Sequence, residues 1–318
     1  MKPSPWVAMA LTLCASCAPA EKVPDARITE ASQLATEGHR EAAIDLLRTV
    51  LEKDPENADG HYRLGLALAD SGDDKGAVAS LGTAVKLDPN FIDAYLALGN
   101  AYLRTEDRRS AFLAFNEAAR LDPNSASAWY DLGVMYYLDA RYDTAIDALR
   151  KARSLRPDDA SIQFRLGMAE MQLGAMRDAE LSFNAALKLD PKLEEAWLNL
   201  ANACTVLGNY DEAEAALVRA LELHPGWSDA LNGKGVLARA RDRSDEALDW
   251  FTQALQADPN NARVHLNLGS LHEARGDTPR AIAEYRKFLE LWEGDIATSE
   301  SARRRLEMLG ASPQTQGS

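Results

Sequence analysis

The chain has 318 residues, 46% of them hydrophobic, and a formal net charge of −14 at pH 7. This acidity argues against a nucleic-acid partner, because proteins that bind a phosphate backbone generally present a basic face. A compact fold of this length would form two or three domains. The repeats described below predict one elongated array instead, in which each repeat buries its apolar face against its neighbours.

The first 17 residues have the pattern of a secretory signal. Lys2 precedes the apolar stretch Trp6 to Leu13, and small residues follow. The stretch is too short to span a bilayer, which needs about 20 apolar residues. We therefore expect a signal peptide over residues 1–17 and a linker over residues 18–25.

Cys17 is the expected site of lipidation. The sequence Ala15-Ser16-Cys17 resembles the end of the lipobox of bacterial lipoproteins, whose cysteine becomes the first residue of the mature protein. The pattern departs from the usual one because Cys14 stands three places before Cys17, where a leucine is common. The resemblance implies a lipid anchor as the only membrane attachment. Ordinary cleavage after Ala20, which would release a soluble periplasmic protein, is the alternative.

A 34-residue pattern then recurs in three independent columns that keep one phase. Glycine follows a leucine or lysine at Gly65, Gly99, Gly133, Gly167, Gly235 and Gly269, with Ala201 in the remaining place. Alanine recurs at Ala77, Ala111, Ala145, Ala179, Ala213, Ala247 and Ala281. Proline recurs at Pro55, Pro89, Pro123, Pro157, Pro191, Pro225 and Pro259.

The clearest copy runs from Ala126 to Pro157 and has the order W-x2-L-G-x2-Y, then A-x3-[large apolar], then P. In this order it resembles the tetratricopeptide repeat family, and the resemblance covers about residues 24–295. It implies an all-α, right-handed α-solenoid of about eight helix–turn–helix repeats. It also implies a function in binding other proteins.

Packing explains why these residue types are needed. Glycine inside a helix costs roughly 1 kcal/mol relative to alanine, so its return predicts a close approach of the two helices of a repeat. The large side chains at Leu81, Phe115, Leu149, Phe183, Leu217, Phe251 and Tyr285 are expected to fill the space between repeats. Each proline restricts the residue before it and ends the second helix.

The predicted organisation follows from this phase. Residues 24–57 form a degenerate first repeat, and residues 58–295 form seven better ones. Residues 296–310 form a capping helix, in which Ala302, Leu306 and Leu309 share one face, and residues 311–318 form a disordered tail.

No segment predicts catalysis, and we expect no catalytic residue, cofactor or metal ligand, hence a protein that is not an enzyme. The Gly233-Lys234-Gly235 cluster lies inside a predicted helix, which is not the setting of a phosphate-binding loop. His265 and His272 are two turns apart, about 10 Å along a helix, so they cannot share one metal ion. Cys204 is predicted to be a small core residue, with a reactive thiol as the alternative.

The family resemblance implies a concave groove lined by the fifth, ninth and twelfth positions of each first helix. In the fourth and fifth repeats these positions hold Tyr130, Val134, Tyr137, Phe164, Met168 and Met171. The flanking candidates are Leu96, Asn100, Leu103 and Arg104 before them, with Leu198 and Asn202 after them. Ordinary packing between repeats is the alternative role for the same side chains.

Two known binding modes of the family are not supported. The carboxylate-clamp variant needs lysine at the fifth position, which here holds residues such as Tyr62, Leu96 and Leu266. The asparagine ladder of glycosyltransferase-linked repeats is broken, because Asn199 and Asn267 are not joined by asparagines between them.

The sequence therefore predicts a non-enzymatic scaffold or adaptor whose partner is a protein or peptide and which binds no nucleic acid. We expect it to hold a segment or subunit of an envelope assembly at the periplasmic side of the outer membrane. The alternative is a regulatory or recruiting partner of an envelope enzyme, such as a glycosyltransferase or a peptidoglycan hydrolase. The sequence leaves self-association open.

Overall fold

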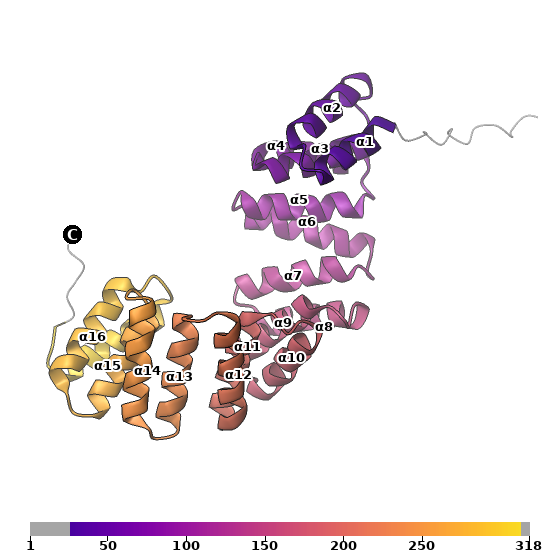
Figure 1. Ribbon diagram of the computed structural model, residues 1–318. Helices are drawn as coiled ribbons and strands as arrows, with labels where there is room; N and C mark the ends of the chain where they lie inside the picture. The colour runs from indigo at the N-terminus through magenta and orange to yellow at the C-terminus, as the bar shows by residue number, and fades with distance from the viewer. Residues whose placement is uncertain (1–25, 313–318) are drawn as a thin grey trace, which may run out of the picture. The chain divides into compact units, whose positions relative to one another are not determined.

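The computed structural model describes residues 26–312, which fold into 17 α-helices and contain no strand (Figure 1). Helices alternate along the chain as the first and second members of successive pairs. This confirms the prediction of an all-α repeat solenoid. The predicted signal peptide and linker, Cys17 and most of the predicted C-terminal tail lie outside the described residues.

The first helices of the pairs begin 34 residues apart from α3 onward. They are α1 (Ala26–Thr36), α3 (Ala58–Ser71), α5 (Ile92–Arg104), α7 (Ala126–Leu138), α9 (Ala160–Gln172), α11 (Glu194–Leu207), α13 (Ser228–Ala240), α15 (Ala262–Ala274) and α17 (Ile296–Met308). The second helices are α2 (Arg40–Lys53), α4 (Asp74–Leu87), α6 (Arg108–Leu121), α8 (Tyr142–Leu155), α10 (Met176–Leu189), α12 (Tyr210–Leu223), α14 (Ser244–Ala257) and α16 (Thr278–Leu291).

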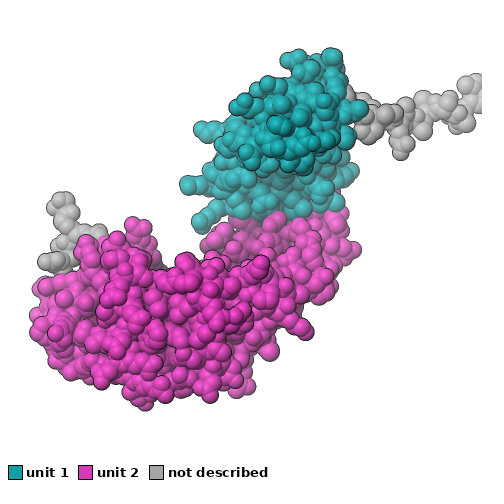
Figure 2. Space-filling model, viewed as in Figure 1, with its two compact units in different colours: residues 1–117 teal, residues 118–318 magenta. Residues whose placement is uncertain are grey.

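The described residues form two compact units, unit 1 up to Glu117 and unit 2 from Ala118, which Figure 2 shows in teal and magenta. The boundary falls inside α6. Within each unit the first helix of a repeat packs against its second helix, and that second helix packs against the first helix of the next repeat. Successive first helices also touch, as α3 touches α5 in unit 1 and α7 touches α9 in unit 2.

Side-chain caps and prolines set the ends of many helices. The side chains of Asn57, Asp73, Ser125 and Asp159 each accept a hydrogen bond from a backbone N–H in the first turn of the helix that follows. Such caps satisfy donors that would otherwise lack a partner. Second helices α2 to α14 end two residues before the repeated proline.

The glycine column meets the large side chains sixteen residues further on. A Cβ atom at Gly133 would lie 2.6 Å from Cγ of Leu149, and one at Gly167 would lie 2.7 Å from a ring carbon of Phe183. Both distances are too short for real atoms. The expectation that the large residues fill space between repeats is therefore incomplete, because all of them except Leu217, whose repeat has Ala201 in the glycine column, pack directly on the glycine of their own repeat.

The fourth position of the first helices has a second structural role besides packing. The indole nitrogens of Trp129 and Trp197 each donate to the carbonyl oxygen of the preceding repeat's proline at 2.9 Å, and the amide nitrogen of Gln163 donates at 3.2 Å. Ring nitrogens of His61 and His265 contact the equivalent carbonyls at 3.0 and 3.1 Å. This bond ties the end of one repeat to the start of the next.

Helix α17 is the first helix of a further repeat that has no second helix in the described chain. It begins in register with the other first helices, and Ala302 and Leu306 are buried against α16 side chains. Arg303 stands where the other repeats have glycine, and it is exposed. A side chain of that size would keep a second helix from packing as closely as in the other repeats.

Candidate partner-binding surface

In unit 2 the predicted groove residues form stripes on α7, α9 and α11. Residues four and seven apart lie on the same helix face, so each set makes one stripe. Seven of the eight side chains are half-buried, and Asn202 is exposed. We call the α7 residues Tyr130, Val134 and Tyr137, together with the α9 residues Phe164, Met168 and Met171, the apolar stripes.

The α7 stripe packs partly on the core of its own repeat and the next. Tyr130 and Tyr137 contact a buried cluster that includes Ile146, Leu149 and Leu166. The ring centroid of Tyr137 lies 5.5 Å from that of Tyr142. Burial raises the pKa of the Tyr137 phenol, so this group stays protonated and neutral near neutral pH.

The α9 stripe is anchored in the same way. The Phe164 ring centroid lies 5.9 Å from that of buried Phe183, and Met168 and Met171 pack against the same core cluster. The guanidinium of Arg165 lies 5.9 Å from the Phe164 ring centroid. Because α7 and α9 are in contact, their stripes offer neighbouring apolar surface with a cation beside it.

In unit 1 the α5 candidates form a more polar surface. Leu96 and Leu103 are half-buried, whereas Asn100 and Arg104 are exposed. The Arg104 guanidinium is 2.6 Å from a carboxylate oxygen of Asp74 on α4, so part of its charge is neutralised locally. Leu198 of α11, in unit 2, packs on the same core cluster as the α9 stripe.

The residues weighed for other chemistry have structural surroundings. Cys204 is 1% exposed, and burial raises the pKa of its thiol to about 11, so the reactive thiolate is scarce near neutral pH. His265 and His272 are both buried. Among residues 26–312, no three histidine, cysteine or carboxylate side chains are grouped so as to hold a metal ion.

Two charged residues occupy core columns without having been predicted to be buried. Glu170 occupies the column that holds Tyr102 and Tyr136, and it is 2% exposed. Lys234 occupies a different column, the one that holds leucine in most other repeats. Its side chain is buried and pairs with the Glu214 carboxylate. Aligning the repeats by column and asking which members are charged would have found both.

A membrane-spanning helix must be both long and apolar. In the described part of the chain, no helix has both the length and the apolar character required to cross a membrane.

Repeated pairs of helices with a small residue, mostly glycine, at the close approach define the class of helical-repeat interaction proteins. Models of the tetratricopeptide repeat match residues 96–160, 139–194, 164–226, 198–262 and 238–289, and a TPR repeat model matches residues 67–105. The chain therefore belongs to the tetratricopeptide repeat family. Proteins of this family generally mediate protein–protein interactions.

Solved structures agree with this fold. A tetratricopeptide repeat protein from Parabacteroides merdae is 17% identical, with a TM-score of 0.65 over 80% of this chain and 98% of that one. PilF of Pseudomonas aeruginosa is 21% identical, with a TM-score of 0.58 over 71% and 99%. YrrB, described as having an unusual peptide-binding site, is 22% identical, with a TM-score of 0.54 over 59% and 97%. No curated protein matched the sequence significantly.

Proposed function

We propose that this protein is a non-enzymatic scaffold that binds a peptide segment or a subunit of an envelope assembly through the apolar stripes of α7 and α9. The observation that carries the proposal is the pair of neighbouring stripes of aromatic and methionine side chains that remain half-exposed. Methionine beside aromatic rings suits an adaptable apolar surface, because its unbranched side chain can repack against different ligands. Membership of a family of interaction proteins supports the same function.

Site-specific crosslinking in intact cells tests the surface directly. A photo-reactive residue at Met168, on the α9 stripe, is expected to capture the partner, which mass spectrometry then identifies. The matched control is Leu181 on α10, which is 69% exposed but lies outside the stripes. Equal capture at both positions, or capture at Leu181 alone, would contradict the proposal. An envelope enzyme as the captured protein would instead support the recruiting role.

The double variant Tyr137→Ala/Phe164→Ala tests the energetics. Removing an aromatic hot spot from an interface often costs 2 kcal/mol or more, about a thirtyfold loss of affinity for each residue. Both rings also touch the core, so we expect Tm to fall by several degrees while the protein stays folded at 25 °C. Binding of the identified partner is measured at that temperature.

The control is Tyr62→Ala in unit 1. Tyr62 holds the same repeat position as Tyr130 and Phe164, is half-buried, and lies 4.8 Å from the Phe91 ring between centroids. It should lower Tm without changing affinity. Unchanged affinity in the double variant would return Tyr137 and Phe164 to a packing role alone.

The proposed location is the periplasmic side of the outer membrane, with a lipid anchor on Cys17. The motivation is the lipobox-like Ala15-Ser16-Cys17 and, after it, Ala18 in place of the aspartate that retains many such lipoproteins at the inner membrane. Cys17→Ser should shift the protein from the membrane fraction to the soluble fraction, whereas Cys14→Ser should not. Metabolic labelling with a palmitate analogue decides the matter, because an unlabelled wild-type protein would exclude the anchor.

A further inference from the structure

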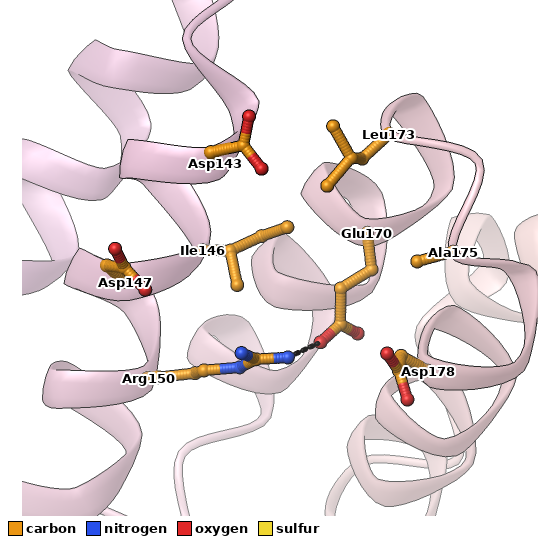
Figure 3. A pocket seen from close by; sticks show the side chains of 8 residues that line it. All are labelled: Asp143, Ile146, Asp147, Arg150, Glu170, Leu173, Ala175 and Asp178. Carbon is orange, nitrogen blue, oxygen red and sulfur yellow. Dashed lines mark hydrogen bonds and ion pairs between the residues drawn. The ribbon is translucent and has the colours of Figure 1, made fainter.

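A pocket of about 180 Å³ lies in unit 2 between the fourth and fifth repeats (Figure 3). Helix α8 contributes Asp143, Ile146, Asp147 and Arg150. Glu170 comes from the end of α9, Leu173 and Ala175 from the turn after it, and Asp178 from the start of α10. The volume is well below the range of roughly 300–1,000 Å³ that is usual for drug-sized ligands. It suits one extended side chain or a small linear molecule.

The pocket is associated with one departure from the repeat. Glu170 stands in the column that elsewhere holds Leu68, Tyr102, Tyr136, Cys204, Ala238, His272 and Leu306. Its carboxylate turns toward α8 and α10, as Figure 3 shows. A buried carboxylate lowers stability unless it is paired. The repeat fold does not require one here, since no other member of the column is a carboxylate.

Glu170 accepts two hydrogen bonds, and its carboxylate can accept a further one from another donor. One carboxylate oxygen accepts a hydrogen bond from Ser182 Oγ at 2.7 Å. The other is 3.4 Å from Nη2 of Arg150, a long contact to a guanidinium whose side chain is about half exposed. An ionised carboxylate can accept about four hydrogen bonds. Burial raises the pKa of Glu170, which means that its present partners do not fully replace water.

The rest of the lining combines charge with an apolar wall. Asp143, Asp147 and Asp178 add three carboxylates, so with Glu170 and Arg150 the lining carries a net charge of −3 when all five groups are ionised. Ile146, Leu173 and Ala175 provide the apolar surface. Ala175 is itself unusual, because the same position holds Asp73, Asp107, Arg141, Asn209, Arg243 and Asp277 in other repeats.

We propose that this pocket binds an aliphatic cation: a lysine or arginine side chain of a partner, or a small linear amine. The cationic head would approach Glu170 and Asp178, and the methylene stem would lie along Ile146 and Leu173. Amphipathic cations bind in this manner, with the stem on apolar surface and the head at polar groups. A metal ion fits less well, because the described residues offer no group of three ligands at metal-binding distances.

The pocket is separate from the apolar stripes. At 100° per residue, Leu173 lies on the opposite side of α9 from the stripe of Phe164, Met168 and Met171, and Glu170 lies about 130° from its centre. The other pocket residues belong to α8, α10 and the turn before α10. A negative result at this pocket would therefore not contradict the function proposed for the apolar stripes, and a negative result at the stripes would not contradict binding at this pocket.

The first experiment is a titration of residues 18–318, the chain without the proposed signal peptide, followed by the methyl NMR signal of Ile146. The probes are N-acetyl-lysine methylamide, spermidine and the uncharged N-acetyl-norleucine methylamide. We expect saturable shifts with the first two and at least tenfold weaker binding of the norleucine compound. Tighter binding of spermidine identifies a free amine as the natural ligand, and tighter binding of the lysine compound identifies a protein side chain. No saturable shift, or equal binding of the uncharged compound, would overturn the inference.

Variants locate the site. Glu170→Tyr restores the residue of Tyr136 and should fill the pocket, abolishing the shift while Tm is kept or raised. Asp143→Asn/Asp147→Asn should weaken binding by about threefold to tenfold, as expected for exposed charges. The matched control is Asp245→Asn/Asp249→Asn, which removes the same charges at the same positions of the seventh repeat. Equal weakening by both pairs would show a general charge effect and would overturn the assignment, even if Glu170→Tyr fails to fold.

Discussion

His265 adds a pH-dependent bond at a repeat position where several other members contact the carbonyl of the preceding proline. Its Nε2 contacts the Pro259 carbonyl oxygen at 3.1 Å, as the tryptophans of the same column do with their own prolines. Its Nδ1 lies 2.6 Å from the Glu284 carboxylate. Burial by itself would lower the pKa of His265, but the bonds to Glu284 and Pro259 outweigh burial and raise it.

The sign of the pH effect follows from this raised pKa. A histidine whose folded pKa exceeds its unfolded value, about 6.5, stabilises the fold fully below that value and progressively less as pH rises through the folded pKa. His265→Gln keeps a donor for Pro259, as Gln163 does for Pro157, but loses the charged bond. It should cost about 1–2 kcal/mol at pH 6 and much less at pH 9, measured by thermal melts across that range.

The control for this prediction is His61→Gln. His61 holds the same repeat position and contacts the Pro55 carbonyl at 3.0 Å. A pH-dependent loss of equal size in both variants would show that the effect does not come from Glu284.

At the scale of the element, the turn between the two helices of each repeat imposes one special backbone conformation. At this turn a residue with positive φ recurs every 34 positions, and six of these nine residues are glycine: Gly38, Gly72, Gly174, Gly208, Gly276 and Gly310. The other three are Glu106, Ala140 and Asp242, with φ of 62°, 55° and 59°. A residue with a Cβ atom pays roughly 1–2 kcal/mol in this left-handed region.

Ala140→Gly should therefore stabilise the protein. The relief of strain exceeds the extra conformational freedom that glycine has in the unfolded chain, so a net gain of about 0.5–1 kcal/mol is expected in urea unfolding. Ala215→Gly is the matched control, because Ala215 is also exposed but lies inside α12. It should destabilise by about 1 kcal/mol. Destabilisation by both changes would refute the argument from backbone strain.

Along the whole molecule each repeat buries its apolar surface against its neighbours, whereas a terminal repeat has a neighbour on one side only. Helix α17 covers Tyr285 and Phe288 of α16, which are among the largest fully buried side chains, and Arg305 pairs with Glu273 at 2.9 Å. In α17 the position that holds glycine in most first helices is occupied by Arg303. The prediction of a capping helix over residues 296–310 rested on the face that Ala302, Leu306 and Leu309 share, which is a local pattern.

The amino-acid sequence by itself determined the fold class, the 34-residue period and the family, because glycine, alanine and proline act on the backbone and on the helix next to them. It also placed Tyr137 and Phe164 on the stripe-forming faces of their helices, since residues four and seven apart share one helix face. Tertiary structure alone decided how deeply these rings are buried, that Glu170 sits beside a pocket, and that His265 meets Glu284. Those features depend on side chains from separate helices, whose distances and solvation no local pattern records.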